Sequence, residues 1–279
     1  MGKKTAAAQK VVPIKGPSLM EPGKGSERVS SRFVVLYGGP KVQKTGACST
    51  LEGAKWVISD PNAIPTLDAL DRLPPEEDIY EVTGIAPARD VLGKMMDVCK
   101  QHGPKGLGCT AVVVDSLTQF QDWHEQDVAQ GTNQRFMGEN KKEGGWQQYN
   151  AEYGAFIDDL GVLARYITVV AIAHAKEKID GTKGDWAGLN LKPQMALKVG
   201  RTANWVLYQS RRNIAVDSTF KGDEFTRIEK DKNGKPMGVE VIIYTQPVGF
   251  WMASANAKNL RAEEPADMAE LLRKEGLFK

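Results

Sequence analysis

The stretch FVVLYGGPKVQKTGACST, residues 33–50, decides the fold expected for this chain. Its first five residues are aromatic, β-branched or apolar, as in a buried strand. Two glycines and a proline then break the strand, and the residues after Lys44 are compatible with a helix. A phosphate-binding loop needs this order, because glycines let backbone N–H groups turn toward an anion and the helix N-terminus adds partial positive charge.

Compared with the phosphate-loop pattern G-x-x-x-x-G-K-[ST], the segment matches at Gly38, Lys44 and Thr45. Lys44 is expected to reach the β- and γ-phosphates of ATP, and the Thr45 hydroxyl to ligate Mg²⁺. Gln43 stands in place of the second glycine, which predicts backbone strain of roughly 1–3 kcal/mol and weaker nucleotide binding if the turn needs a glycine conformation. The alternative is a chance match. The predicted nucleotide-binding residues are Gly38, Gly39, Pro40, Lys41, Val42, Gln43, Lys44, Thr45 and Gly46.

Length and composition are those of a globular α/β protein. The 279 residues are 41% apolar and 26% charged, and a formal charge of +2 is too small to argue for nucleic acid by itself. Three cysteines with no C-x-x-C pair argue against disulfides and a zinc ribbon. The longest clean apolar run, 167–173, is too short to span a bilayer. We therefore expect a soluble, cytoplasmic protein with no membrane partner.

A second candidate site residue ends the apolar run TAVVVD, residues 110–115. A strand buried on both faces of a parallel sheet has this pattern, and its last residue lies at the carboxyl edge where α/β sheets bind ligands. Asp115 is therefore the predicted Mg²⁺-positioning acid. The alternative is an ordinary helix N-cap at Asp115 or Ser116.

Other strands and helices alternate along the chain. The helical spacing of apolar residues is clearest at 149–163, and it leads directly into an apolar strand capped by His174. Such alternation predicts right-handed βαβ units and an α/β fold with a mainly parallel sheet flanked by helices. Strands are expected at 33–37, 55–59, 110–115, 167–173, 205–208, 241–245 and 250–253, and helices at 88–101, 149–163 and 265–274.

Together these motifs resemble the phage-encoded RecA/KaiC-like P-loop ATPases, in particular the Sak-type single-strand annealing and recombination ATPases, nucleotide-binding proteins of the AAA family. The matching stretches are YGGPKVQKT (37–45), AVVVDSLTQF (111–120), VVAIAHAKEK (169–178) with the helix before it, and AKNLRAEEPADMAELL (257–272). The resemblance covers nearly the whole chain. It implies a RecA-like ATPase domain at 31–279 with a late strand pair and a C-terminal helix. Residues 1–30, where lysines stand among Pro, Gly and Ser with little periodicity, are expected to form a flexible N-terminal arm, with a nucleic-acid-binding tail as the alternative.

Carried over residue by residue, the resemblance implies that Lys44 and Thr45 bind phosphate and Mg²⁺ and that Asp115 positions Mg²⁺ and water. The strand ending at His174 is expected between the phosphate-loop strand and the Asp115 strand, which makes His174 a γ-phosphate sensor; a hydrogen-bonded strand-end histidine is the alternative. No glutamate follows the second strand, where RecA-like enzymes keep a water-activating base. Asp60 is the nearest candidate for that base.

The resemblance also implies contacts outside the nucleotide site. Lys176 and Lys178 match the place from which related assemblies project cationic fingers into a neighbour's site, with solvated loop lysines as the alternative. The loops at about 130–148 and 176–200 are expected to face single-stranded DNA. The DNA-binding candidates are Arg135, Lys141, Lys142, Lys183 and Lys192, with Trp146 and Trp186 available to stack on bases.

Three functions fit these expectations. The first is an oligomeric ring or filament that binds ATP, Mg²⁺ and single-stranded DNA and promotes annealing or strand exchange in the host cytoplasm, with a single-strand-binding protein as a further partner. The second is a nucleotide-binding assembly protein with a degenerate loop and little hydrolysis, which Gln43 favours. The third is a replication accessory ATPase.

Overall fold

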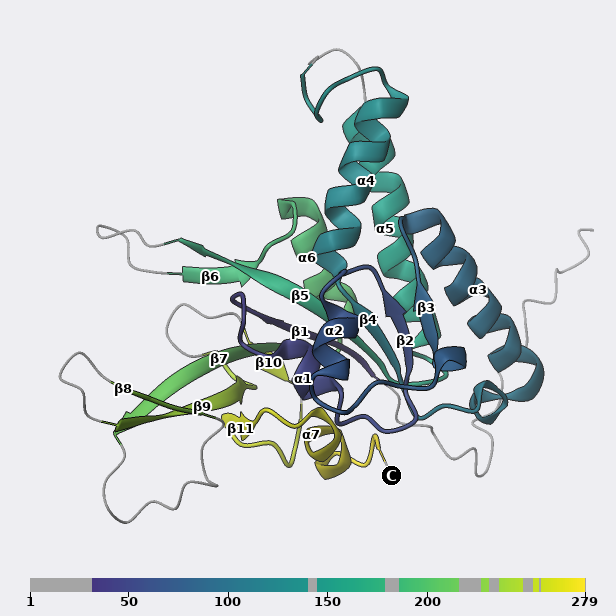
Figure 1. Cartoon of the computed structure of the whole chain (residues 1–279). Helices are drawn as coiled ribbons and strands as arrows, with labels where there is room; N and C mark the ends of the chain where they lie inside the picture. The colour runs from purple at the N-terminus through teal and green to yellow at the C-terminus, as the bar shows by residue number, and fades with distance from the viewer. Residues whose placement is uncertain are drawn as a thin grey trace, which may run out of the picture.

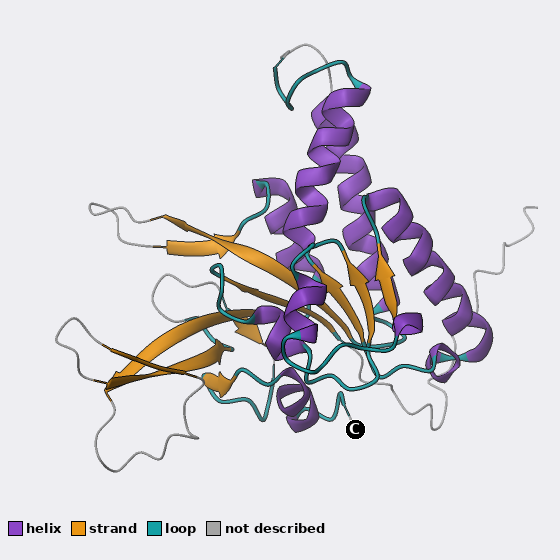
Figure 2. Ribbon diagram, viewed as in Figure 1, coloured by secondary structure: helices purple, strands orange, loops and turns teal. Residues whose placement is uncertain are grey.

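In the part of the chain that the structure describes, apolar strands and the helices between them build an 11-stranded sheet with helices on both faces (Figures 1 and 2). The main strand order is β11-β9-β7-β1-β5-β4-β2-β3. The structure is a computed structural model, and it describes residues 32–139, 145–178, 186–215, 227–230, 236–247, 253–255 and 257–278. The predicted arm at 1–30 lies outside these residues.

The centre of the sheet is parallel, as the alternation of strands and helices predicts. Its parallel strands are β1 (Phe33–Gly38), β2 (Lys55–Ile58), β3 (Ile79–Glu81), β4 (Val112–Asp115), β5 (Val169–Lys178) and β7 (Trp205–Ala215). β5 pairs with β1 on one side and with β4 on the other. The strand that carries His174 therefore lies between the phosphate-loop strand and the Asp115 strand, where the sequence resemblance predicts it.

Antiparallel strands extend one side of this sheet and the end of β5. They are β6 (Trp186–Leu189), β8 (Arg227–Lys230), β9 (Pro236–Tyr244), β10 (Ser254–Ala255) and β11 (Glu263–Pro265). Figure 2 shows the long β7 and β9 strands side by side, reaching beyond the parallel centre. The strand expected at 241–245 is the last part of β9. Residues 250–252 of the other expected late strand lie outside the described residues.

Two helical layers cover the two faces of the sheet. Alternate residues of each strand face opposite sides, so Phe33, Val35 and Tyr37 join one core and Val34 and Leu36 the other. The first core packs against α3 (Ile85–His102), α4 (Leu117–Gly131), α5 (Gly145–Leu163) and α6 (Pro193–Thr202). The second packs against α1 (Lys44–Cys48), α2 (Ala63–Asp68) and α7 (Met268–Lys274). Short 3-10 helices at Glu76–Asp78 and Pro104–Leu107 lie in connections between these elements.

Two sequence-based boundaries were wrong. The segment 176–200, expected as a loop, contains the end of β5, strand β6 and most of α6, because β5 continues past His174 into an antiparallel pair with β6. The helix N-cap considered at Asp115 or Ser116 is present at Ser116, which accepts a hydrogen bond from the Gln119 N–H at the start of α4. The last helix starts at Met268 rather than at Pro265, since Asp267 is its N-cap and Pro265 belongs to β11.

No helix among the described residues is long and apolar enough to span a membrane. The candidate site residues lie where the parallel strands end. The carboxyl ends of β1, β2 and β4 and the middle of β5 carry, in turn, the glycine loop, Asp60, Asp115 and His174. The fold thus brings four separate sequence segments to one edge of the sheet.

Gly38→Ala tests how closely the strands approach at this edge. A Cβ at Gly38 would collide with the backbone carbonyl of Gln209 and lie 2.9 Å from the Val42 Cγ2 atom. We expect the free energy of unfolding to fall by about 1–3 kcal/mol, as for other overpacked sites. Denaturant unfolding measures it.

Gly93→Ala is the matched control, because a Cβ at Gly93 of α3 would have nothing within 4 Å. It should be neutral or stabilise by up to about 1 kcal/mol, the helix-propensity difference. Equal stability of the two variants would contradict the close approach at Gly38.

Candidate functional site

The glycine loop runs from the end of β1 into α1, and Lys44 closes it. The Lys44 Nζ atom donates hydrogen bonds to the carbonyl oxygens of Gly38, at 3.1 Å, and Gly39, at 2.8 Å. Lys44 is only 7% exposed. Burial, the largest cause, lowers the pKa of its ammonium, while the charges of Asp115 and Asp60 oppose that shift. The Lys44 ammonium is thus buried and bound to backbone carbonyls of its own loop.

Gln43 adopts a backbone conformation that glycine favours. Its φ is 62° and its ψ 37°, in the left-handed region, and Lys41 also has a positive φ of 60°. For a residue with a Cβ this region costs roughly 1–2 kcal/mol. The Gln43 side chain is exposed, so the long amide does not fill the turn. The mismatch to the loop pattern is therefore a matter of backbone strain and not of a steric block.

Thr45 and Asp115 join the loop to strand β4. The Thr45 Oγ1–H donates a hydrogen bond of 2.8 Å to Asp115 Oδ2. Asp115 is 2% exposed, and burial raises the pKa of its carboxyl to about 7, against the Thr45 hydrogen bond and the Lys44 charge, which lower it. The Asp115–Ser116 peptide bond that follows is cis.

These two side chains offer oxygen donors of the kind that Mg²⁺ takes, together with phosphate oxygens and water. Among the described residues no group of three or more His, Cys, Asp or Glu side chains could hold a metal ion. A divalent ion here would therefore depend on the oxygens of a bound ligand to complete its coordination. The arrangement fits a metal that arrives with a nucleotide.

Asp60 and His174 face each other beside this pair. The His174 Nε2 atom lies 3.9 Å from Asp60 Oδ2, and the His174 N–H donates to the Thr118 hydroxyl at 2.9 Å. Burial, and then the charge of Lys44, lower the pKa of His174, so its imidazole is neutral near pH 7. The Asp60 N–H donates to the Asp115 carbonyl at 3.0 Å, which ties the end of β2 to the end of β4.

A cavity of about 510 Å³ lies beside the loop. Its lining combines apolar walls from the 69–72 turn and β11 with carboxylates and a guanidinium. The lining residues are Gln43, Gly46, Ala47, Leu70, Arg72, Glu240, Val241, Pro265, Ala266 and Asp267. The volume is in the range of small-molecule pockets, and Leu70 is 43% exposed there.

The two predicted finger lysines belong to a strand and not to a loop, which corrects the sequence-based placement. Lys176 and Lys178 lie on β5, opposite Gly188 and Trp186 of β6. The Lys176 side chain is exposed. A two-stranded pair beyond the edge of the main sheet carries them, so their backbone is more constrained than that of a loop.

The DNA-binding candidates that the structure describes each have an acidic neighbour. Arg135 Nε lies 3.2 Å from Glu139 Oε1, and Lys192 Nζ lies 3.0 Å from Glu125 Oε2 and over the Trp146 ring. These ion pairs reduce the positive charge the segment offers to a phosphate backbone. Lys141, Lys142 and Lys183 lie outside the described residues, as does the side chain of Trp186.

Three supporting residues were missed by the sequence analysis. Thr118 accepts from the His174 N–H, and the Ser59 hydroxyl accepts from the Ser116 N–H at 2.9 Å. Gln209 is fully buried and donates to the Val42 carbonyl. Of the three, only Gln209 stands out in the sequence, as a polar residue directly after the apolar run WVLY. The other two act through contacts that no local pattern encodes.

Comparison with protein families places residues 31–224, more than half of the chain, in a match to the family model described as an AAA domain. No curated protein matches the chain. Similar solved structures include an ATPase from the type III secretion system of pathogenic bacteria, with 12% sequence identity, a TM-score of 0.42 and coverage of 64% of this chain and 52% of that one. The chain thus spans about half the length of that structure. A likeness at this level adds nothing about the site.

The raised pKa of Asp115 predicts a pH-dependent effect of Asp115→Asn. The carboxyl ionises near pH 4 in the unfolded chain and near pH 7 in the folded one, so the folded state binds more protons between these values and loses stability as the pH rises. Without nucleotide or Mg²⁺, Asp115→Asn should therefore stabilise the protein at pH 8 by on the order of 2–4 kcal/mol more than at pH 5. Urea unfolding at both pH values measures this difference.

Asp97→Asn, at an exposed position of α3, is the matched control. It should change stability by less than about 1 kcal/mol at either pH, as exposed ion pairs do. An Asp115→Asn effect of the same size at pH 5 and pH 8 would mean that the carboxyl is not held uncharged by burial.

Proposed function

This chain belongs to the AAA domain family of P-loop ATPases, and on that premise we propose that it is a Mg²⁺-dependent ATPase that acts on single-stranded DNA. The observation that carries the enzymatic part is the Thr45–Asp115 hydrogen bond, 2.8 Å long, beside the buried Lys44. A hydroxyl, a carboxylate and an ammonium from two separate segments meet at one edge of the sheet. Phosphoryl transfer needs little more from a protein than such positioning and charge.

In this proposal Lys44 leaves the carbonyls of Gly38 and Gly39 and binds the β- and γ-phosphates. Loop residues 38–46 surround the phosphates, and the cavity beside Gln43 and Gly46 takes the nucleoside. Its apolar side chains at Leu70 and Pro265 suit a base, and its polar groups suit a sugar. The triphosphate then runs from this cavity along the loop toward Asp115.

Thr45 and Asp115 would hold the metal through the hydroxyl oxygen and the carboxylate. Bound Mg²⁺ supplies charge neutralisation to the phosphates. Asp60 and the neutral His174 lie next to this pair, where Asp60 accepts a hydrogen bond from the attacking water and His174 donates one to the γ-phosphate. Asp60 is one methylene shorter than the glutamate it replaces in this role, which favours slow turnover.

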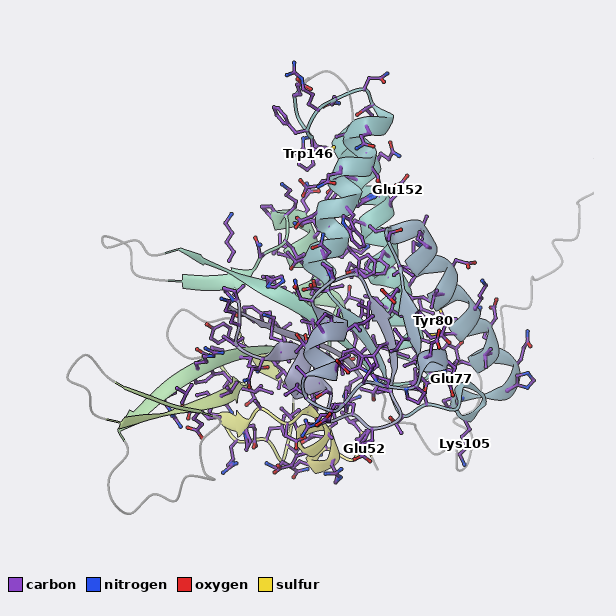
Figure 3. All side chains as sticks on the ribbon, viewed as in Figure 1. Glu52, Glu77, Tyr80, Lys105, Trp146 and Glu152 are labelled. Carbon is purple, nitrogen blue, oxygen red and sulfur yellow. The ribbon has the colours of Figure 1, made fainter. Side chains whose placement is uncertain are left out.

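The DNA-binding part of the proposal rests on the sequence resemblance and on one surface. Trp146, 38% exposed, lies at the outer end of α5 (Figure 3), and Phe136, 64% exposed, lies in the segment that follows α4. Exposed aromatic rings next to cations suit stacking on unpaired bases. The partners we propose are single-stranded DNA, further copies of this chain in a ring or filament, and a single-strand-binding protein, in phage recombination by annealing or strand exchange. Lys176 and Lys178 would reach a neighbouring copy's nucleotide.

Gln43 favours one second candidate, a nucleotide-binding assembly protein that hydrolyses ATP scarcely at all. The left-handed backbone at this non-glycine residue costs free energy, and no glutamate follows β2. In this version ATP is a structural ligand that controls assembly. Hydrolysis measured in the natural protein and in Gln43→Gly separates the two candidates, because only the second predicts turnover that is absent or confined to the glycine variant.

Lys44→Ala tests the nucleotide site. Each charge-assisted hydrogen bond contributes roughly 1.5–3 kcal/mol, so loss of the ammonium should weaken ATP binding by about 100-fold or more while the protein stays folded. Titration with a fluorescent ATP analogue measures the affinity, and circular dichroism reports the fold. Lys94→Ala, an exposed lysine of α3, is the control and should bind like the natural protein. Unchanged affinity in Lys44→Ala would remove the site assignment.

Steady-state Mg-ATP hydrolysis with and without an unpaired oligonucleotide tests the whole proposal. We expect DNA to raise the rate, and Lys141→Glu with Lys142→Glu to weaken DNA binding about tenfold or more and to flatten its salt dependence. The control is Lys94→Glu with Lys100→Glu, which makes the same charge change on α3. If both double variants bind DNA equally, the DNA surface lies elsewhere; if DNA leaves the rate unchanged, the polymer substrate is wrong.

A further inference from the structure

Val42 lies between the two left-handed residues of the phosphate loop, Lys41 and Gln43. Its side chain is 8% exposed. Its carbonyl belongs to the peptide that leads into Gln43, so the orientation of that peptide and the φ of Gln43 are linked. Because a peptide unit is planar, whatever fixes the Val42 oxygen also fixes the Gln43 N–H on the opposite side.

Gln209 holds that oxygen. Its Nε2–H donates to the Val42 carbonyl at 2.6 Å, and the side chain has no exposed surface. Gln209 lies on β7 directly opposite Gly38 of β1, at the residue where the loop begins. The absence of a side chain at Gly38 lets the Gln209 backbone approach this closely. The amide therefore reaches the loop from a rigid central strand.

We propose that Gln209 is a positioning residue that keeps the Val42–Gln43 peptide in the orientation a nucleotide needs, and so allows a residue other than glycine to occupy position 43. An L-residue at this position is more stable at negative φ, which it reaches by rotating the preceding peptide. Rotation would carry the Val42 oxygen away from Gln209. The hydrogen bond opposes this rotation. A glycine at position 43 would be stable at positive φ and would not need the hydrogen bond to stay there.

The cost of keeping an amide at position 209 supports this role. Gln209 Oε1 is buried and accepts no hydrogen bond from the residues that the structure describes. A buried polar atom without a partner is destabilising, and a methionine of similar length would avoid it. The neighbouring residues of β7, Leu207 and Tyr208, are buried apolar or aromatic side chains. Packing alone therefore gives no reason for glutamine here, while the Val42 contact does.

The inference rests on the proposed nucleotide function of the loop, and a double-mutant cycle tests it. The variants are Gln209→Met, Gln43→Gly and the two combined, with affinity measured for a fluorescent Mg-ATP analogue. With Gln43 present, Gln209→Met should weaken binding about tenfold, as for a lost buried hydrogen bond; with glycine at 43 it should weaken binding less than about twofold. A general destabilisation by Gln209→Met would lower affinity equally with either residue at position 43. Affinity restored by glycine at position 43 therefore indicates the specific coupling.

Gln121→Met is the matched control. Gln121 is also a buried glutamine, but its Oε1 accepts from the Tyr149 hydroxyl and the Lys192 N–H, away from the loop. It should leave nucleotide affinity unchanged whether residue 43 is glutamine or glycine. If Gln209→Met does not fold, Gln209→Asn keeps an amide that is one methylene too short and replaces it in the cycle.

Two results would overturn the inference: no loss of affinity in Gln209→Met, or the same loss with glutamine and glycine at position 43. If the natural protein binds no nucleotide, the proposed function fails and the inference is judged on the loop itself. Amide hydrogen exchange at residues 42–44 should then be faster in Gln209→Met and return toward the natural rate in the combined variant. If the exchange rates at residues 42–44 were the same in Gln209→Met as in the natural protein, the inference would be overturned even without nucleotide binding.

Discussion

The hydrogen bond between Thr45 and Asp115 is the contact on which the site depends. It joins the first helix after the glycine loop to the end of a strand seventy residues later, across the intervening strand β5. The bond forms because β1, β5 and β4 are parallel and in register, so that Gly38 lies opposite His174 while Asp115 lies opposite Ile172. Burial of the carboxyl makes the contact sensitive to charge, since the raised pKa of Asp115 means that ionisation without a cation is unfavourable.

The loop shows how a backbone requirement can be met without the usual residue. Left-handed φ values at Lys41 and Gln43 carry a conformational cost, and the structure surrounds them with restraints. Lys44 bonds to two carbonyls at the start of the loop, and Gln209 bonds to a third in its middle. Strained conformations persist when their surroundings fix them from several sides, and they concentrate at functional sites.

The aromatic outer end of α4 and α5 is separate from the nucleotide edge, and the two regions are joined by packed elements. Tyr153 of α5 donates to the carbonyl of Leu117, the first residue of α4, and Thr118 of α4 accepts from the His174 N–H. α4 thus runs from the immediate neighbourhood of the candidate site toward the outer end where Trp146 lies (Figure 3). In the proposed function, this helix connects the nucleotide site with a polymer bound at the outer end.

The sequence by itself determined the strand, loop and helix from Phe33 onward, the acid-ended strand at Asp115 and the α/β class, because each depends on local propensity and on the spacing of apolar residues. It could not determine that Gln43 is exposed and left-handed, that Lys192 is already paired with Glu125, or that β5 continues into a pair with β6. Nor could it locate α6, whose apolar residues show weak periodicity, or the start of α7, because Pro265 has the character of a first helical residue. Only the tertiary structure brought Asp60, His174 and Gln209 to the loop, since sheet order and register, which no local pattern encodes, decide which distant residues meet.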